Sequence, residues 1–152
     1  MQTVKPRRNH SDEHYLIDIC DRVLGRTAAR QHRFDWLRGD PGKNRRGAML
    51  PVDAFYEDLG LVVEVMEDQH RQTVPFFDKR TTVSGMSRGE QRRRYDELRA
   101  RLLPERGLCL VCLMTNDFES RRRRLVRETH SDEQVIRNVL RKFLAIKIKD
   151  GN

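Results

Sequence analysis

The chain has 152 residues, which is enough for one domain with a proper core and too few for us to expect two, so residues 1–152 are predicted to form a single domain. Apolar residues make up 37%, charged residues 36%, and the formal net charge is +8, which predicts a folded protein with a heavily charged surface. There is no apolar run near ~20 residues and no signal-peptide pattern, which argues against a membrane protein and indicates a cytoplasmic one.

The N-terminal part of the chain predicts one helix, one strand and a loop. Ser11 can cap a helix whose apolar residues fall on one face, and Gly25 is its stop signal. Residues 31–37 contain Phe, Trp and Leu and can form a first strand. Segment 39–47 is rich in Gly, Lys and Arg and is typical of a basic loop.

The C-terminal half predicts a helix, a strand and a last helix. Ser87 with Glu90 forms a capping box for a helix that is ended by Pro104 and Gly107, and the apolar run 108–114 has strand length. Ser131 can cap a final helix. The last helix has a continuous apolar stripe of Val135, Ile136, Val139, Leu140, Phe143 and Leu144. This stripe can pack on the sheet, which is its commoner use, or pair two copies in a homodimer.

Three cysteines, an odd number, argue against a disulfide framework. Cys109 and Cys112 have CxxC spacing but lie in a predicted strand, where positions i and i+3 point to opposite faces. They therefore cannot converge on one metal ion. Both, together with Cys20, are predicted to be buried small hydrophobic residues.

An acidic segment lies within the basic chain. Residues 51–78 hold one Lys or Arg against seven Asp or Glu, whereas 1–50 and 79–152 have net charges of +5 and +9. A polyanion is attracted to most of this surface and repelled at one place unless a cation lies there. The acids could instead simply collect in one loop, but the strand patterns at 50–56 and 61–66 indicate a hairpin.

Two acids of this hairpin are predicted to be neighbours. If the chain turns about Asp58-Leu59, Asp53 lies directly opposite Glu64, with Cβ atoms ~5 Å apart. Like charges at that distance need neutralisation, and ligands that are all oxygen suit Mg²⁺ or Mn²⁺. The backbone carbonyl of Val65 could add a third oxygen. A register shifted by one residue would instead turn the two acids to opposite faces.

The same residues resemble a known family. The segments 50–56 (LPVDAFY) and 60–65 (GLVVEV), followed by Gln69-His70, resemble the very-short-patch-repair-like branch of the PD-(D/E)XK nuclease superfamily. The element order over 11–114 also resembles the α-β-β-β-α-β core of that superfamily. The resemblance implies a restriction-endonuclease-like α/β (α+β) fold, a mixed sheet flanked by helices with the last helix added. It also implies Mg²⁺-dependent cleavage of a nucleic-acid phosphodiester, with Asp53 and Glu64 as metal ligands.

The sequence departs from the superfamily at Met66, where a lysine is expected. Candidates for the missing catalytic group are Gln69, His70 and Lys79. We favour His70, because an imidazole beside a metal-bound water can exchange a proton near neutral pH, although it could merely hydrogen-bond the end of the strand. The segment 67–71 (EDQHR) also matches four letters of the EDxHD homing-nuclease motif.

Further roles follow from the resemblance. Glu13 lies in the first turn of the first helix, where these nucleases often carry an acid that reaches the metal, or it is a favourable charge at a helix N-terminus. Segment 78–80 resembles a D-x-R segment of this branch, so Lys79 or Arg80 could contact the scissile phosphate, or both could be solvated.

Three basic segments could contact nucleic acid or be solvated faces. They contain Arg45 and Arg46; Arg92, Arg93 and Arg94; and Arg121, Arg122, Arg123 and Arg124. Consecutive arginines on a helix spread over most of a turn, so those at 92–94 cannot all face one duplex.

The sequence thus predicts a small Mg²⁺- or Mn²⁺-dependent DNA endonuclease of repair, homing, mobile-element or defence type. One alternative is a nucleic-acid-binding module of the same fold in which Met66 records the loss of chemistry. Another is an RNA-binding protein whose acids are structural. Double-strand cleavage would favour a homodimer, because the chain has one candidate centre.

Overall fold

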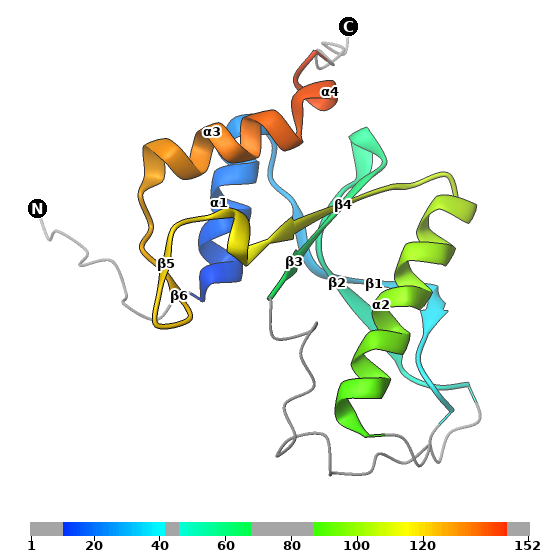
Figure 1. Cartoon of the computed structure of the whole chain (residues 1–152). Coiled ribbons are helices and arrows are strands. Elements are labelled where there is room, and N and C mark those ends of the chain that lie inside the picture. The colour runs from blue at the N-terminus through cyan, green and yellow to red at the C-terminus, as the bar shows by residue number, and fades with distance from the viewer. Residues whose placement is uncertain (1–10, 42–45, 68–86, 146–152) are drawn as a thin grey trace, which may run out of the picture.

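The computed structural model describes residues 11–41, 46–67 and 87–145 (Figure 1). Its regular elements are α1 (Asp12–Leu24), β1 (Ala29–Arg38), β2 (Met49–Tyr56), β3 (Leu61–Met66), α2 (Arg88–Glu105), β4 (Cys109–Met114), β5 (Ser120–Arg121), β6 (Arg124–Leu125), α3 (Thr129–Val139) and α4 (Arg141–Leu144). The predicted α-β-β-β-α-β-α order is confirmed, with a small β5–β6 hairpin added before α3. Among the described residues, no helix is both long and apolar enough to cross a bilayer.

The protein is a mixed α/β structure built on one four-stranded sheet of order β1-β2-β3-β4. β1, β2 and β3 pair antiparallel and β3 pairs parallel with β4, so the sheet is mixed as predicted. Figure 1 shows α2 on one side of the sheet and α1 with α3 on the other. Two clusters of buried side chains form accordingly, one around α1 and one that includes Leu103 of α2.

α1 begins and ends at the two predicted signals. The Ser11 side chain accepts a hydrogen bond of 3.1 Å from the backbone N–H of His14, and Gly25 ends the helix in the left-handed conformation at φ 66°. Between these residues, the apolar face is buried against the sheet and the C-terminal helices: Leu16, Ile17, Ile19, Cys20, Val23 and Leu24. Each large apolar side chain buried in this way stabilises the fold by about 1.5–3 kcal/mol.

α2 ends between its two predicted stop signals. Ser87 caps its N-terminus by accepting a hydrogen bond of 3.2 Å from the N–H of Glu90. The helix passes through Pro104 and ends at Glu105, before Gly107. Proline removes only one hydrogen bond in this last turn, and the preceding Leu103 is fully buried. Gly107 then turns the chain at φ 77°, and its N–H donates to the carbonyl of Pro104.

The C-terminal helices correct two predictions. α3 starts before Ser131, whose hydroxyl donates to the carbonyl of Glu128 instead of capping the helix. The apolar stripe is not continuous, because the chain changes from α3 to α4 at Leu140, and Val139 and Leu144 are 40% and 37% exposed. The remaining apolar residues pack in the α1 cluster, so the stripe covers α1 rather than the sheet alone.

The cysteines follow the predicted geometry but not the predicted burial. Cys109 packs against the α1 cluster, whereas Cys112 is in register with Glu64, on the side of the sheet that faces α2. The two thiols therefore lie on opposite faces. Cys20 is buried as predicted, Cys109 is partly buried, and Cys112 is exposed. The burial prediction failed for Cys112 because β4 is an edge strand.

Candidate functional site

The hairpin of β2 and β3 has the predicted register. Ala54 pairs with Val63, and the pairing runs from there to the turn. Continuing it by one residue in the other direction places Asp53 opposite Glu64. The turn is the short 3-10 helix η1 (Glu57–Leu59), closed by a glycine in the left-handed conformation. The alternative register, which would separate the two acids, is therefore excluded.

The Asp53 side chain is held against the neighbouring strand. Its Oδ2 atom accepts a hydrogen bond of 2.7 Å from the backbone N–H of Val65. The carboxylate thus takes the place that a backbone carbonyl would have if the ladder continued. This bond fixes the direction of the carboxylate, which also interacts with the side chain of Glu64. The proposed use of the Val65 carbonyl as a ligand stays a prediction.

Glu64 is a buried acid that lacks a hydrogen bond on one oxygen. Its side chain is 13% exposed, and its Oε1 atom is buried without a hydrogen-bond partner among the described residues. Burial, followed by the negative charge of Asp53 and a side-chain hydrogen bond with it, raises the pKa of Glu64 to about 9. Without a cation the pair therefore retains a proton at neutral pH. A buried acceptor without a partner is costly, which makes Glu64 Oε1 an exception among buried polar atoms.

Arg99 of α2 places a positive charge beside this acid. Its Nε lies 3.7 Å from Glu64 Oε1, beyond hydrogen-bonding distance, and the side chain is 14% exposed. The guanidinium is held in place by donating to the carbonyl of Pro51 at 3.2 and 3.0 Å and to Asp96 Oδ1 at 3.2 Å. Its charge lowers the pKa of Glu64, against the larger effects that raise it.

The prediction from sequence did not include Arg99, although a signal was present. Arg99 is four residues after Tyr95 and three before Leu102, so it lies within the face of α2 that carries the apolar residues. An arginine in that face has to find a partner in the sheet. The three consecutive arginines at 92–94 are a stronger signal of a basic surface in the sequence than the single Arg99.

Glu13 approaches the pair from α1. Its carboxylate accepts a hydrogen bond of 2.8 Å from Gln31 of β1, and burial and the charge of Asp53 raise its pKa. Gln31 has a positive φ of 51°, which is uncommon for a residue other than glycine. Glu13 does not complete a ligand set, because the described ranges contain no group of three or more His, Cys, Asp or Glu side chains arranged to hold a metal ion.

The other predicted site residues fall into two groups. Gln69, His70, Lys79, Arg80 and Arg45 lie outside the described residues. The rest are exposed: Arg46 after the first loop, Arg92 and Arg93 on α2, and Arg121 and Arg122 in the β5–β6 hairpin.

Two of the basic segments lie apart in the fold. The backbone N–H of Leu125 donates to Asp12 at 3.1 Å, which attaches the β5–β6 hairpin to the start of α1. Figure 1 shows this hairpin beside α1, whereas α2 lies on the other side of the sheet. Contact of Arg121–Arg124 and of Arg92–Arg94 with nucleic acid stays a prediction.

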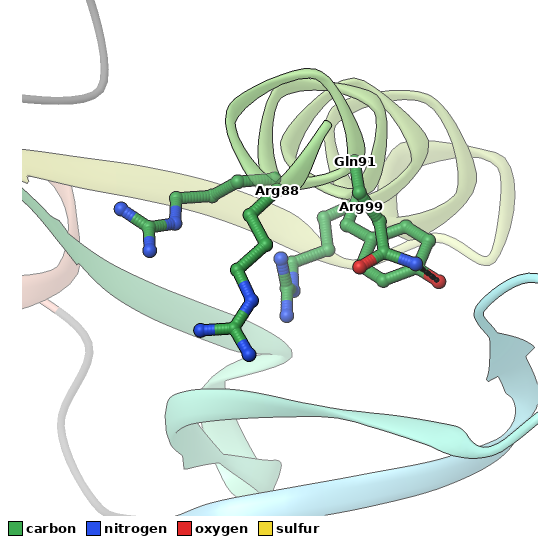
Figure 2. Close-up of a pocket in the computed structure, with 5 residues that line it drawn as sticks. Arg88, Gln91 and Arg99 are labelled. Atoms are coloured by element: carbon green, nitrogen blue, oxygen red, sulfur yellow. Dashed lines mark hydrogen bonds between the residues drawn. The ribbon is translucent and has the colours of Figure 1, made fainter. Parts of the chain in front are cut away.

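A cavity of about 270 Å³ adjoins the acid pair and is called the α2 cavity here. It is lined by Arg88, Gln91, Arg92, Tyr95 and Arg99. Figure 2 shows the side chains of Arg88, Gln91 and Arg99 leaving the same side of the helix. The cavity includes Arg92 and not Arg93, which settles which of these two predicted contact residues faces it.

Comparison of the chain with protein-family models, curated proteins and solved structures gave no significant match. The resemblance carried by segments 50–56 and 60–65 therefore stays a prediction. The function of the chain is inferred from the geometry of its own residues.

Proposed function

We propose that this protein is a metal-dependent DNA endonuclease in which Asp53 and Glu64 hold Mg²⁺ or Mn²⁺. One observation carries the proposal: Glu64 Oε1 is buried without a hydrogen bond, beside a second carboxylate whose direction is fixed by the N–H of Val65. Two acids in that arrangement repel each other unless a proton or a cation lies between them.

The donor set fits a hard divalent cation. Asp53 offers its Oδ1, Glu64 offers its Oε1, and both are oxygens, which Mg²⁺ and Mn²⁺ prefer. Mg²⁺ retains several waters and is often held by only one or two carboxylates together with substrate phosphates, so a third acid is not required. The carbonyl of Val65 remains the proposed third protein ligand.

The residues of the chain have separate tasks in phosphodiester hydrolysis. A bound cation supplies a water of lowered pKa and polarises a phosphate oxygen. Glu64 releases its proton when it becomes a ligand, and Asp53 needs no reorientation. Arg99, held by Pro51 and Asp96, can offset charge that develops on the phosphate. Proton exchange with the attacking water is assigned to His70, with Gln69 and Lys79 as the other candidates.

The architecture supports the same proposal. The α-β-β-β-α-β order, with a mixed sheet between α1 and α2, is the order that the nuclease resemblance implies. The acid pair lies on β2 and β3, the two central strands, where packing on both sides holds side chains in place. A restriction-endonuclease-like fold is therefore part of the proposal.

A second candidate is a DNA-binding module without catalysis. Met66 stands in place of the expected lysine, and Lys142 in α4 is the sole lysine of the described ranges. Arg99 also offsets part of the negative charge of Glu64 in the absence of any metal. These features favour a site that keeps its geometry but does not catalyse phosphodiester hydrolysis.

Cleavage of supercoiled plasmid distinguishes the two candidates. The wild type, Asp53→Asn and Glu64→Gln are incubated with Mg²⁺, with Mn²⁺ and with EDTA. A nuclease nicks or linearises plasmid only with metal, and each variant loses at least ~100-fold of the rate. Equal folding of the three proteins is verified by thermal unfolding in EDTA. If the wild type binds DNA but shows no metal-dependent cleavage that the variants lose, the protein is a binding module.

A further inference from the structure

The α2 cavity carries more positive charge than its neighbours offset. The guanidinium of Arg99 faces Glu64 and donates to Asp96, so its charge is shared. Arg88 and Arg92 are exposed and form no ion pair with a described residue, and none of the described residues that line the cavity is an acid. Within the described part of the chain, two positive charges at the cavity therefore have no acidic partner.

The remaining groups of the cavity are also hydrogen-bond donors. Gln91 Nε2 and the backbone N–H of Asp40 each donate to the Tyr95 hydroxyl at 3.0 Å. Because that oxygen then accepts two hydrogen bonds, the hydrogen of the hydroxyl is available to donate to a ligand. Guanidinium groups and a phenol hydroxyl together form a donor set suited to the oxygens of a phosphate group.

The size of the cavity limits what it can hold. Its volume of about 270 Å³ lies just below the ~300–1,000 Å³ of pockets that bury drug-sized ligands. A phosphate group fits this space.

We propose that the α2 cavity binds one backbone phosphate of duplex DNA, with Arg88 and Arg92 as its charged contacts and Tyr95 as a neutral donor. The identification of the ligand as DNA rests on the proposed function; the phosphate chemistry rests on the cavity itself. Arg99 lines the cavity and lies 3.7 Å from Glu64, so a strand anchored here passes directly beside the acid pair. The cavity thereby sets the position of the strand, separately from the residues that hold the metal.

The test measures binding without cleavage. Fluorescence anisotropy of a labelled DNA duplex is recorded in EDTA over a series of salt concentrations, for the wild type and for Arg88→Gln/Arg92→Gln. The matched control is Arg101→Gln/Arg141→Gln, which removes the same charge at exposed positions outside the cavity. We expect the cavity variant to lose at least ~10-fold in affinity and its log–log salt slope to fall by about 0.9, the value for one phosphate contact. The control should change less than ~3-fold.

Two outcomes would overturn the inference. The first is equal loss of affinity in the cavity variant and the control, which would mean that only total charge matters. The second is protection of the wild type against thermal unfolding by millimolar inorganic phosphate, abolished in the cavity variant, while duplex binding is unchanged. That result would assign the cavity to a small phosphorylated molecule. Because EDTA excludes cleavage, this binding test is independent of the nuclease assay. A protein that does not cleave plasmid can still bind DNA through the cavity, and one that cleaves plasmid can still fail this test.

Discussion

The two faces of the sheet differ in whether their carboxylates have hydrogen-bond partners. On the α1 face, Asp21 accepts hydrogen bonds from the Tyr56 hydroxyl at 2.7 Å and the Ala28 N–H at 3.0 Å, and it forms an ion pair with Arg30. On the α2 face, Glu64 Oε1 is buried with no such partner. Both oxygens of Asp21 thus have partners, whereas Oε1 of Glu64 lacks one.

The difference agrees with the proposal that the α2 face is the binding face. Buried polar groups in folded proteins are nearly always hydrogen-bonded, because an unpaired one costs about 1–3 kcal/mol. The α1 face follows this rule, and there Tyr15 also donates to Asp132 at 2.6 Å. The exception on the α2 face lies beside a cavity lined by arginines, as the proposed ligand site would require.

The largest effect is expected from breaking the α1 network. Asp21→Ala leaves the Tyr56 hydroxyl, the Ala28 N–H and Arg30 without their shared acceptor. We expect a loss of about 3 kcal/mol in the free energy of unfolding, measured by urea denaturation. Tyr56→Phe, which removes only one of these bonds, should cost about 1 kcal/mol. Equal stability of Asp21→Ala and wild type would contradict the contrast between the two faces.

The second effect concerns pH and Glu64. Its folded pKa of about 9 exceeds the ordinary value of 4.5, so between these values the folded state holds a proton that the unfolded state has released. Stability from this group is therefore fully present below about pH 4.5 and is lost as the pH rises toward 9. Metal-free wild type should lose about 2 kcal/mol more than Glu64→Gln between pH 5 and 9.

The Glu64 prediction has an internal control. Saturating Mg²⁺ should remove most of the difference between wild type and Glu64→Gln at pH 8, because the cation replaces the proton. Chemical denaturation in EDTA and in Mg²⁺ measures both states. Parallel pH profiles for the two proteins in EDTA would show that Glu64 ionises as an ordinary exposed acid does.

A third, smaller effect tests the link between α1 and α3. Asp132 is 2% exposed and receives its hydrogen bond from Tyr15. Tyr15→Phe should lower the free energy of unfolding by about 1–2 kcal/mol, because the buried carboxylate loses a donor. Tyr15→Phe/Asp132→Asn completes a double-mutant cycle, and a coupling energy near zero would exclude a direct contribution of this bond.

The smallest effect is expected in the interrupted stripe. Val139→Ala should change stability by less than about 0.5 kcal/mol because Val139 is 40% exposed, whereas Ile136→Val should cost about 0.5–1.5 kcal/mol because Ile136 is fully buried. Thermal or urea unfolding of both variants measures the difference. Equal costs would support the continuous stripe that the sequence predicts.

Local signals in the sequence were sufficient for the starts of α1 and α2 and for the acid pair. Ser11, Gly25 and Ser87 act on atoms within a few residues, and a short turn sets the register that brings Asp53 opposite Glu64. These features depend on neighbouring residues alone, so their prediction did not require the rest of the fold.

The contacts between elements could not be predicted in this way. Arg99 reaches Glu64 only because α2 crosses the sheet at one particular angle, and Cys112 is exposed only because no further strand covers β4. Similarly, the hairpin around Arg122 and the cavity around Arg92 lie on different sides of the sheet. The periodicity of apolar residues predicts which face of a helix or strand is buried, but not which other element covers that face.

The pairing of Tyr15 with Asp132 joins residues that are 117 positions apart. On a ribosome that adds about 5–20 residues per second, α3 is synthesised roughly 6–23 s after α1. During that interval, α3 does not yet cover the apolar face of α1. The nascent chain should therefore be most vulnerable to aggregation or proteolysis in this window, and a ribosome stalled before α3 should yield a chain that proteases cleave within α1.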